Sequence, residues 1–359
     1  MKVMTILGTR PEIIRLSCVI PKLDRLCSHI LVHTGQNYDD RLNDIFFKEL
    51  GVRQPDCCLG VNESDFSRQI GKLLPAVAQV ILGEKPDKVL ILGDTNSGLT
   101  AIIAKRMGIP VFHMEAGNRC FDDRVPEEVN RRIIDHCSDI LMPYTERSRT
   151  NLLREGIESR CIYVIGNPIY EVVEFYSNQV KSSKIINKLG LKKHGYFLVT
   201  AHRSESVDNI KHLQDIVIGL EAIQKKYELP VIYSLHPHTK DRMGKYNLIP
   251  TNIRLVPPFG FFDFIALEQN ALCVITDSGT VQEECSIFKI PNITIRGTTE
   301  RPETIECGSN ILAGIEPDGM VRAVAVALEG GHGWNSPVGY QEGNVSSKVV
   351  KIVLSPNKY

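Results

Sequence analysis

An apolar run leads directly into a polar turn in the stretch ALCVITDSGTVQEE, residues Ala271–Glu284. Its first part, Leu272–Ile275, has the length and branching of a buried strand, and the residues after the turn suit the start of a helix. Such a turn leaves backbone N–H groups unpaired where the helix dipole also favours negative charge. The stretch therefore predicts either an ordinary capped turn or a phosphate site at Ser278 and Gly279, with Glu284 placed to accept two ribose hydroxyls.

The same alternation recurs along the whole chain. Short β-branched runs end in polar or glycine-containing turns, and a helical stretch follows each of them. This pattern is typical of βαβ units with parallel sheets and right-handed crossovers. The twelve runs are Val3–Leu7, Ile30–His33, Val89–Leu92, Val111–Met114, Ile140–Pro143, Tyr163–Ile165, Phe197–Thr200, Val231–Leu235, Ile253–Val256, Leu272–Ile275, Ile293–Ile295 and Ile311–Ala313. They fall into two sets, which predicts an α/β protein with two doubly wound domains.

The length of 359 residues also exceeds what one ordinary core contains. We place the boundary after Pro168, giving an N-terminal domain of residues 1–168 and a second domain of residues 169–344. Glu171–Lys193 is expected to be a helical connector. A glycine-rich break at Gly330–Pro337 precedes a last helix at Val345–Leu354, and we expect residues 345–359 to pack back on the first domain.

The composition excludes several classes of protein. Lys plus Arg equals Asp plus Glu at 42 each, and the scattered basic residues argue against a nucleic-acid partner. No apolar stretch has transmembrane length, and the N-terminus lacks a signal peptide, so we expect a cytoplasmic protein that binds no membrane. The ten cysteines include no C-x-x-C pair, and H-E-x-x-H is missing, so no metal site is predicted.

In open parallel sheets, ligands bind beyond the carboxyl ends of the strands. Two such edges facing each other would make a cleft. In the first domain Asp94 and Glu115 each follow a predicted strand, and Glu127 and Glu128 begin a helix after Pro126. Acids in a first helical turn stabilise the dipole, which explains one of the two glutamates. Carboxylates that converge at one edge raise each other's pKa and so divide acid and base roles.

The remaining edge residues each allow two interpretations. Arg10 either holds a diphosphate or pairs with Glu12. His202 either caps a helix or works as a phosphate ligand or proton donor. Spacing does not distinguish His236 from His238.

The aromatic segment after the third strand of the second domain and Arg301 also allow two interpretations each. The aromatic segment around Phe259, Pro258–Phe262, either stacks on a base or belongs to the core. Arg301 either clamps phosphate or pairs with a glutamate.

Taken together, these motifs resemble the non-hydrolysing UDP-N-acetylglucosamine 2-epimerase family. The matching stretches, in family order, are Gly8–Glu12 (GTRPE), Thr34–Gln36 (TGQ), Gly93–Thr95 (GDT), Glu115–Arg119 (EAGxR), Pro126–Arg132 (PEExNRR), Ala201–Arg203 (AHR), Thr276–Glu284 (TDSGxxQEE) and Thr298–Glu303 (TTERPE). Each is weak alone, but they are spread over most of the chain and together are highly specific.

The resemblance implies a GT-B fold, in which two Rossmann-like domains face each other across a cleft and the second holds most of the UDP. It also implies a homodimer, no nicotinamide cofactor, and inversion at C2 of a UDP-2-acetamido sugar, UDP-N-acetylglucosamine giving UDP-N-acetylmannosamine. UDP is eliminated anti, a 2-acetamidoglucal forms, and UDP adds back. The implied catalytic residues are Asp94, Glu115, Glu127 and His202. The implied substrate-binding residues are Arg10, Arg15, His236, Phe259, Ser278, Gly279, Glu284 and Arg301.

The sequence also departs from the family pattern. Arg15 stands where many members have lysine, and Gln36–Asp39 differs from the segment of members that UDP-N-acetylglucosamine activates allosterically. The short Asn118–Phe121 loop resembles a branch that makes UDP-N-acetyl-L-fucosamine from the 6-deoxy-L-talose epimer. That branch, a hydrolysing epimerase, a GT-B glycosyltransferase and a non-catalytic UDP-sugar sensor are the alternatives.

Overall fold

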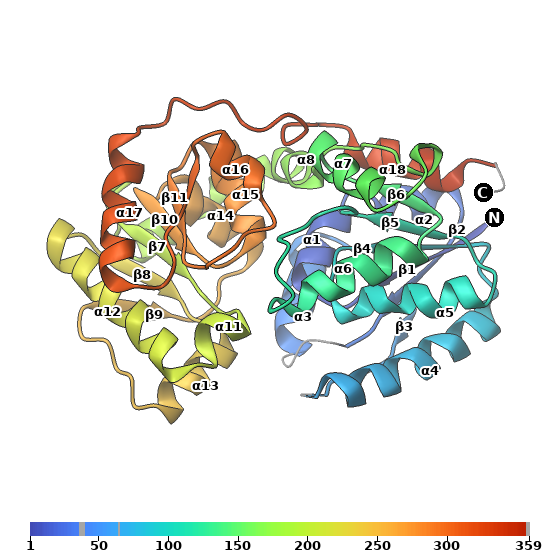
Figure 1. Cartoon of the computed structure of the whole chain (residues 1–359), viewed down its shortest axis with the longest axis horizontal. Helices are drawn as coiled ribbons and strands as arrows, with labels where there is room; N and C mark the ends of the chain where they lie inside the picture. The colour runs from blue at the N-terminus through green and yellow to red at the C-terminus, as the bar shows by residue number, and fades with distance from the viewer. Residues whose placement is uncertain (36–39, 64, 357–359) are drawn as a thin grey trace. The chain divides into compact units, whose positions relative to one another are not determined.

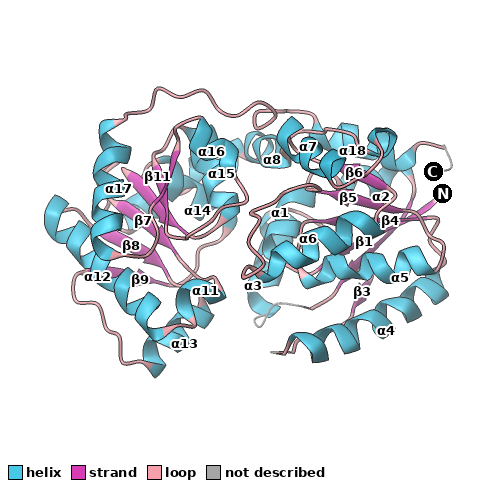
Figure 2. Cartoon of the chain, in the orientation of Figure 1, coloured by secondary structure: helices cyan, strands magenta, loops and turns pink. Residues whose placement is uncertain are grey.

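The computed structural model describes residues 1–35, 40–63 and 65–356, and the chain divides into two compact units. Unit 1 comprises Met1–Phe175 and Val338–Tyr359, and unit 2 comprises Tyr176–Pro337. Each unit is a parallel sheet with helices on both of its faces (Figures 1 and 2). The Gln36–Asp39 segment lies outside the described residues.

Unit 1 contains a sheet of six parallel strands in the order β3-β2-β1-β4-β5-β6. The strands are β1 (Lys2–Leu7), β2 (Ser28–His33), β3 (Cys57–Cys58), β4 (Lys88–Leu92), β5 (Val111–Met114) and β6 (Ile140–Met142). The central strands β1, β4 and β5 are almost entirely buried, which is why they read as continuous apolar runs. Ile6 pairs with Val32 on one side and with Ile91 on the other.

Two expectations about these strands are wrong. Tyr163–Ile165 forms no strand: its N–H groups donate to Leu141 and Pro143, but only one isolated bridge, between Leu141 and Ile162, results. The edge strand β3 is instead Cys57–Cys58, whose two residues are too few to produce an apolar run.

The helices of unit 1 include α4, whose sequence explains its position. Asp65 caps it by accepting the N–H of Arg68, and its buried residues Gln69, Leu73, Val77 and Ile81 recur every fourth position on one face. The helices are α1 (Arg10–Leu16), α2 (Ile20–Leu26), α3 (Asp40–Glu49), α4 (Phe66–Glu84), α5 (Ala101–Arg106), α6 (Pro126–Cys137), α7 (Glu146–Arg154), α8 (Pro168–Phe175) and α18 (Val345–Leu354), with 3-10 turns η1 (Asn96–Thr100) and η2 (Ser159–Cys161).

The last helix, α18, belongs to unit 1 and contacts α2 and α8 (Figure 1). The backbone N–H of Ser346 donates to Oε2 of Glu171 at 2.7 Å, and Nζ of Lys22 donates to the Ser346 hydroxyl at 2.6 Å. Further along, Nζ of Lys88 donates to the carbonyl of Val353 at 2.7 Å. These contacts fix the C-terminal helix against residues from the start of the chain.

Unit 2 repeats the architecture with the order β12-β11-β10-β7-β8-β9, and all six of its strands overlap predicted runs, with ends that differ by at most one residue. The strands are β7 (Phe197–Thr200), β8 (Val231–Ser234), β9 (Ile253–Val256), β10 (Cys273–Thr276), β11 (Asn292–Thr294) and β12 (Asn310–Leu312). The helices are α9 (Ser177–Ser182), α10 (Ile185–Lys188), α11 (Ser204–Val207), α12 (Ile210–Tyr227), α13 (Pro237–Lys245), α14 (Phe261–Gln269), α15 (Gly279–Phe288), α16 (Pro302–Glu306) and α17 (Pro317–Glu329).

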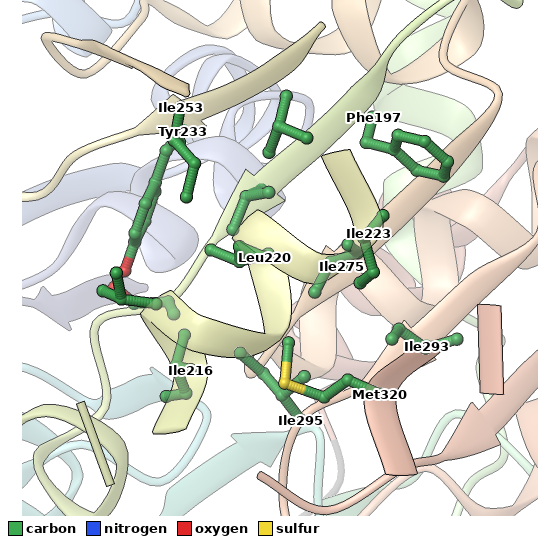
Figure 3. Close-up of a cluster of buried hydrophobic side chains, with 14 of the residues drawn as sticks. Phe197, Ile216, Leu220, Ile223, Tyr233, Ile253, Ile275, Ile293, Ile295 and Met320 are labelled. Atoms are coloured by element: carbon green, nitrogen blue, oxygen red, sulfur yellow. The ribbon is translucent and has the colours of Figure 1, made fainter. Parts of the chain in front are cut away.

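The core of unit 2 lies between its sheet and the helices α12 and α17 (Figure 3). Ile275 and Ile293 of the sheet, Leu220 of α12 and Met320 of α17 are fully buried. A Cβ added at Gly219 would lie 2.6 Å from the sulfur of Met320, so this glycine lets the two helices approach closely. Burial of each large aliphatic side chain stabilises the fold by about 1.5–3 kcal/mol.

The two sheets share one topology. In unit 1 the chain builds β2 and β3 on one side of β1 and β4, β5 and β6 on the other; in unit 2 it does the same around β7. The direction of winding therefore reverses between β1 and β4 and again between β10 and β7. Such switch points open a crevice at the carboxyl ends of the strands. The prediction of two doubly wound α/β domains is confirmed.

Candidate active site

Four neighbouring strands of unit 1 deliver the candidate side chains to one edge. Glu12 follows β1, Asp94 follows β4, Glu115 follows β5 and Tyr144 follows β6. Because these strands are adjacent and parallel, the residues that follow them share the carboxyl edge of the sheet.

Glu12 holds the turn after β1. Its Oε2 accepts the N–H groups of Gly8 at 2.5 Å and Thr9 at 2.8 Å, and its Oε1 accepts the hydroxyl of Thr95 at 2.6 Å. Burial raises the pKa of Glu12 to about 7, and the nearby charge of Asp94 adds to the effect. Sequence reasoning considered this residue only as a partner for its neighbour Arg10.

Arg10 is the first residue of α1, so it begins the helix rather than lying in a turn before it. Its guanidinium lies 5.8 Å from the ring centroid of Phe46, and burial lowers its pKa. The aromatic contact orients this cation at the switch point beside β1.

Asp94 is tied to helix α6. Oδ2 of Asp94 accepts from Nε of Arg131 at 2.8 Å and lies 2.7 Å from its Nη2. The backbone carbonyl of Asp94 accepts from the side-chain amide of Asn130 at 3.0 Å. The loop after β4 is thus fixed by two residues of α6, and the predicted site residue Asp94 is an ion-paired carboxylate.

The two glutamates at the start of α6 differ. Glu128 is fully buried; it accepts the N–H groups of Cys120 and Phe121 and pairs with Arg131 at 2.7 Å. Burial would raise its pKa, but these hydrogen bonds outweigh burial and hold the pKa below its usual value. Glu128 therefore anchors the loop that leads into the helix, whereas Glu127 is half-exposed at the N-terminal turn.

Glu115 has an unusual backbone. Its φ is +69°, a left-handed conformation that costs a non-glycine residue about 1–2 kcal/mol. Its N–H donates to the carbonyl of Met142 at 3.1 Å, which holds the turn in place. At Gly117, where φ is +79°, an added Cβ would lie 2.3 Å from the carbonyl oxygen of Ser148. The Glu-Ala-Gly motif thus places a strained glutamate between a strand end and a close backbone approach.

The Glu115 carboxylate is held by two buried side chains. Its Oε2 accepts from Nη1 of Arg15 at 2.8 Å and from the hydroxyl of Tyr144 at 3.2 Å, while Oε1 lies 3.3 Å from the side-chain amide of Asn118. Arg15, expected to bind substrate, is thus directed at a carboxylate. Tyr144 was missed by sequence reasoning, although it follows a predicted strand at this edge.

A second charged network lies beneath this turn. Asp135 of α6 is fully buried and accepts from His113 at 2.8 Å and from the N–H of Gly117 at 3.1 Å, and it lies 2.8 Å from Nη2 of Arg119. Burial alone would raise the pKa of Asp135, but the contacts with His113 and Arg119 hold it below its usual value. The network fixes the Glu115 turn from below.

In unit 2, Asp277 organises the switch point. It is fully buried, and its Oδ2 accepts the N–H groups of both His202 and Arg203 at 2.8 Å. Nδ1 of His202 lies 3.6 Å from the other oxygen of Asp277, and its ring lies 5.4 Å, centroid to centroid, from the ring of His236. Because β10 and β7 are neighbours, one buried carboxylate sets the position of the half-exposed His202.

The structure distinguishes the two histidines after β8. His236 caps α13 and contacts His202, whereas Nε2 of His238 lies 2.9 Å from Oδ1 of Asp208, away from that pair. His236 therefore belongs with the His202 edge. Phe259, which follows β9, is also half-exposed, whereas its neighbour Phe261 is buried against Tyr176.

The N-terminus of α15 begins at Gly279, with Ser278 as its capping position. A Cβ added at Gly279 would lie 2.4 Å from Oε1 of Glu300, so only glycine fits without displacing that carboxylate. Glu300 is itself held by Arg296 at 2.9 Å and by Arg203 at 3.3 Å. The turn predicted as a phosphate site thus has an extended Ser278, a helix start and two arginines nearby.

Two residues predicted to bind substrate, Arg301 and Glu284, are buried, and each contacts another buried side chain. Arg301 is directed at Glu283 and forms an ion pair with it. Glu284 is hydrogen-bonded to Glu268, which has no exposure; burial and then the charge of Glu284 raise the pKa of Glu268 well above its usual value.

The described residues also bear on metal binding, membrane insertion and disulfides. Within residues 1–35, 40–63 and 65–356, no His, Cys, Asp and Glu side chains gather in threes or more as metal ligands would. No helix in the same part of the chain is both long and apolar enough to span a bilayer. The ten cysteines are free thiols.

Comparison with known proteins extends this description. Residues 22–354 match the family model described as UDP-N-acetylglucosamine 2-epimerase. The UDP-N-acetylglucosamine 2-epimerase of Methanocaldococcus jannaschii is 41% identical over 371 residues, with complete coverage of both chains. The crystal structure of the epimerase from that organism, in complex with UDP-GlcNAc and UDP, has a TM-score of 0.94 at 40% identity and covers 98% of this chain and 99% of that chain.

A relative with a different sugar is also similar. The UDP-2,3-diacetamido-2,3-dideoxy-D-glucuronate 2-epimerase of Pseudomonas aeruginosa is 36% identical over 334 residues, covering 91% of this chain and 92% of its own. The family model and the relatives extend over nearly the whole chain, across both units, and they agree with the resemblance carried by the motifs. The chain therefore belongs to the UDP-N-acetylglucosamine 2-epimerase family, and it is an isomerase with a GT-B type fold of two Rossmann-like domains.

Proposed function

We propose that the protein inverts C2 of a UDP-2-acetamido sugar without hydrolysing it, and that it interconverts UDP-N-acetylglucosamine and UDP-N-acetylmannosamine. The observation that carries this proposal is the gathering of Asp94 and Glu115 at one sheet edge, each fixed by an arginine. Removal of a proton from carbon and its replacement on the other face require two acid/base groups, whereas transfer to an acceptor requires one base.

Unit 2 is proposed to hold the UDP. The α15 N-terminus at Ser278 and Gly279 suits a diphosphate, because the first turn of a helix directs backbone N–H groups outward and the helix dipole favours an anion there. His202 lies at the adjoining strand end and would assist at the diphosphate. His236, Phe259, Glu284 and Arg301 complete the proposed UDP-binding set, with Glu284 for the ribose and Phe259 for the base.

Unit 1 is proposed to act on the sugar, with Arg10 holding the diphosphate. One carboxylate among Asp94, Glu115 and Glu127 takes the C2 proton while the bond between C1 and the UDP oxygen breaks. The electron pair of the C2–H bond becomes the C1=C2 double bond of a 2-acetamidoglucal, and UDP leaves with the pair of the C1–O bond. In the return step a carboxylic acid delivers a proton to the opposite face of C2 as UDP adds to C1. The sum is an isomerisation.

The test is incubation with UDP-N-acetylglucosamine in D2O without any acceptor, followed by proton NMR. We expect deuterium at C2 in both epimers and no free sugar. Free N-acetylmannosamine with UDP would indicate a hydrolysing enzyme. Retention of the C2 proton, with turnover only on addition of an acceptor, would indicate a glycosyltransferase, and binding without any exchange would indicate a sensor.

The acetamido sugar is the finer question, and the Pseudomonas aeruginosa relative supports a second candidate substrate, a UDP-2,3-diacetamido-2,3-dideoxyglucuronate. The same NMR time course, run in parallel with this sugar, UDP-N-acetylglucosamine and the UDP-6-deoxy-L-talose derivative, ranks the three by kcat/KM. We expect UDP-N-acetylglucosamine to rank first.

We also propose that the enzyme acts in the cytoplasm as a homodimer, as the family resemblance implies. Light scattering would then report twice the chain mass of 40.2 kDa. A mass of one chain at assay concentration would contradict the dimer.

A further inference from the structure

We propose that Tyr144 is a positioning residue for the reaction: together with Arg15 it holds one oxygen of Glu115 and so fixes the plane of the carboxylate that exchanges the proton. We call Arg15 and Tyr144 the Glu115 clamp. The inference rests on the proposed function, because it assigns Glu115 a part in proton transfer.

The geometry of the clamp is a closed triangle. Nη1 of Arg15 donates to Oε2 of Glu115 at 2.8 Å and to the Tyr144 hydroxyl at 3.1 Å, and that hydroxyl donates to the same Oε2 at 3.2 Å. The guanidinium also lies 5.4 Å from the centroid of the Tyr144 ring. Both clamp side chains are almost fully buried, at 1% and 2% exposure, so water does not compete for their hydrogen bonds.

Each member of the triangle comes from a different element whose backbone is fixed. Arg15 is on α1, Glu115 follows β5, and Tyr144 lies between β6 and α7, where the next residue, Thr145, caps the helix by accepting the N–H of Ser148. A Cβ added at Gly339 would lie 2.7 Å from the Tyr144 carbonyl oxygen, which shows how closely the chain packs on this residue. The clamp is therefore part of a rigid frame.

Two hydrogen-bond donors restrict the rotation of the Glu115 carboxylate more than one donor can. The last torsion of a glutamate side chain is broad, so a carboxylate with a single donor can pivot about that contact. Donors from two directions to the same oxygen restrict the pivot and fix the carboxylate plane. Small displacements of a reacting group reduce rates strongly, so an orienting hydroxyl has a measurable effect on catalysis.

The decisive variant is Tyr144→Phe, which removes only the hydroxyl and keeps the ring against Arg15. We expect kcat for epimerisation and the rate of C2 deuterium incorporation to fall together by roughly tenfold, with KM little changed, because the hydroxyl orients a reacting group and does not bind substrate. Tyr196→Phe is the matched control, because its buried hydroxyl donates to the carbonyl of Leu267 in unit 2. It is expected to leave kcat unchanged.

A double-mutant cycle separates positioning from mere structural support. In a Glu115→Gln background the Tyr144→Phe change should lower the residual rate no further, because the group it orients has already been lost. An unchanged kcat for Tyr144→Phe beside a large loss for Glu115→Gln would overturn the clamp and leave the proposed function intact. A near-native rate for Glu115→Gln would overturn both the role of Glu115 and the clamp.

Arg15→Lys tests the other half of the clamp and also serves if the tyrosine variant does not fold. Both contacts come from Nη1, which the planar guanidinium holds in place, whereas the ammonium of lysine keeps the charge on a flexible stem. We expect a fall in kcat without a rise in KM. A rise in KM at unchanged kcat would show that Arg15 contacts substrate and would overturn the clamp.

Discussion

The two units have the same strand order but present opposite chemistry at the carboxyl edges of their sheets. In unit 1 the residues after the strands include the acids Glu12, Asp94 and Glu115, each fixed by a donor from another element. In unit 2 a buried acid, Asp277, is directed at backbone N–H groups, and the strand ends beside it carry the half-exposed His202 and the start of helix α15. One topology therefore carries two different sets of side chains, which suits the division of tasks that we propose.

The difference shows that the task lies in the few residues beyond each strand and not in the sheet. In unit 1, Arg15 and Arg131 form ion pairs with the predicted catalytic carboxylates Glu115 and Asp94. In unit 2, Arg203 and Arg296 pair with one shared carboxylate, Glu300, which lies beside the helix start that suits an anion. Variants that affect one edge should therefore separate chemistry from nucleotide binding.

The largest effect is expected from the acidic edge. Glu115→Gln should lower kcat by at least about two orders of magnitude, because loss of an acid/base group typically costs that much. The affinity for UDP, measured by calorimetry, should be unchanged, since the proposed UDP site is mainly in unit 2 and its member in unit 1 is Arg10. Glu146→Gln, at an exposed position in α7, is the matched control. A parallel loss of UDP affinity in Glu115→Gln would remove the proposed separation of tasks.

A smaller effect is expected at the anion-binding edge. Gly279→Ala places a methyl group 2.4 Å from Oε1 of Glu300, which must leave its arginine partners or distort the start of α15. UDP affinity should fall at least about tenfold, a loss of about 1.4 kcal/mol. Gly297→Ala is the control, because nothing lies within 4 Å of its added Cβ. Equal UDP affinities in the two variants would argue against nucleotide binding at α15.

Much of this arrangement follows from the sequence. The central strands of unit 2 read as apolar runs because both faces of the sheet are covered there, and its partly exposed edge strands are still apolar enough that all six were predicted. Asp94 and Glu115 were assigned to one edge by the rule that parallel strands end together, and β4 and β5 are indeed neighbours. Apolar runs did not identify the strand Cys57–Cys58, because two residues are too few to form such a run.

The contacts that fix the acids were not predictable in the same way. Arg131 reaches Asp94 across 37 positions of the chain, and Tyr144 reaches Glu115 across 29. Such pairs depend on how α6 and β6 pack, and no local pattern encodes that. Tyr144 nevertheless had a usable signal, because it directly follows the predicted run Ile140–Pro143 and so belongs to the same edge as the acids.

The smallest effect is expected at Glu12, where the free energy of unfolding is compared at two pH values. Burial raises the pKa of Glu12 from 4.5 to about 7, so the folded chain keeps this proton at pH values where the unfolded chain has lost it. The stabilisation that the proton provides is complete below the unfolded pKa and is lost as pH rises through about 7. Wild-type stability should therefore lose roughly 1 kcal/mol from this group between pH 6 and pH 8.

Glu12→Gln should remove that loss, because its amide oxygen can still accept from Gly8 and Thr9 while its amide nitrogen donates to Thr95. Urea unfolding at pH 6 and pH 8 measures the free energies of unfolding of variant and wild type. Relative to the wild type, the variant should be more stable at pH 8 than at pH 6. Glu174→Gln, at an exposed position of α8, controls for the change in net charge. If the Glu12→Gln difference is the same at both pH values, Glu12 is ionised in the folded chain throughout, and the edge of unit 1 carries one more negative charge than we infer.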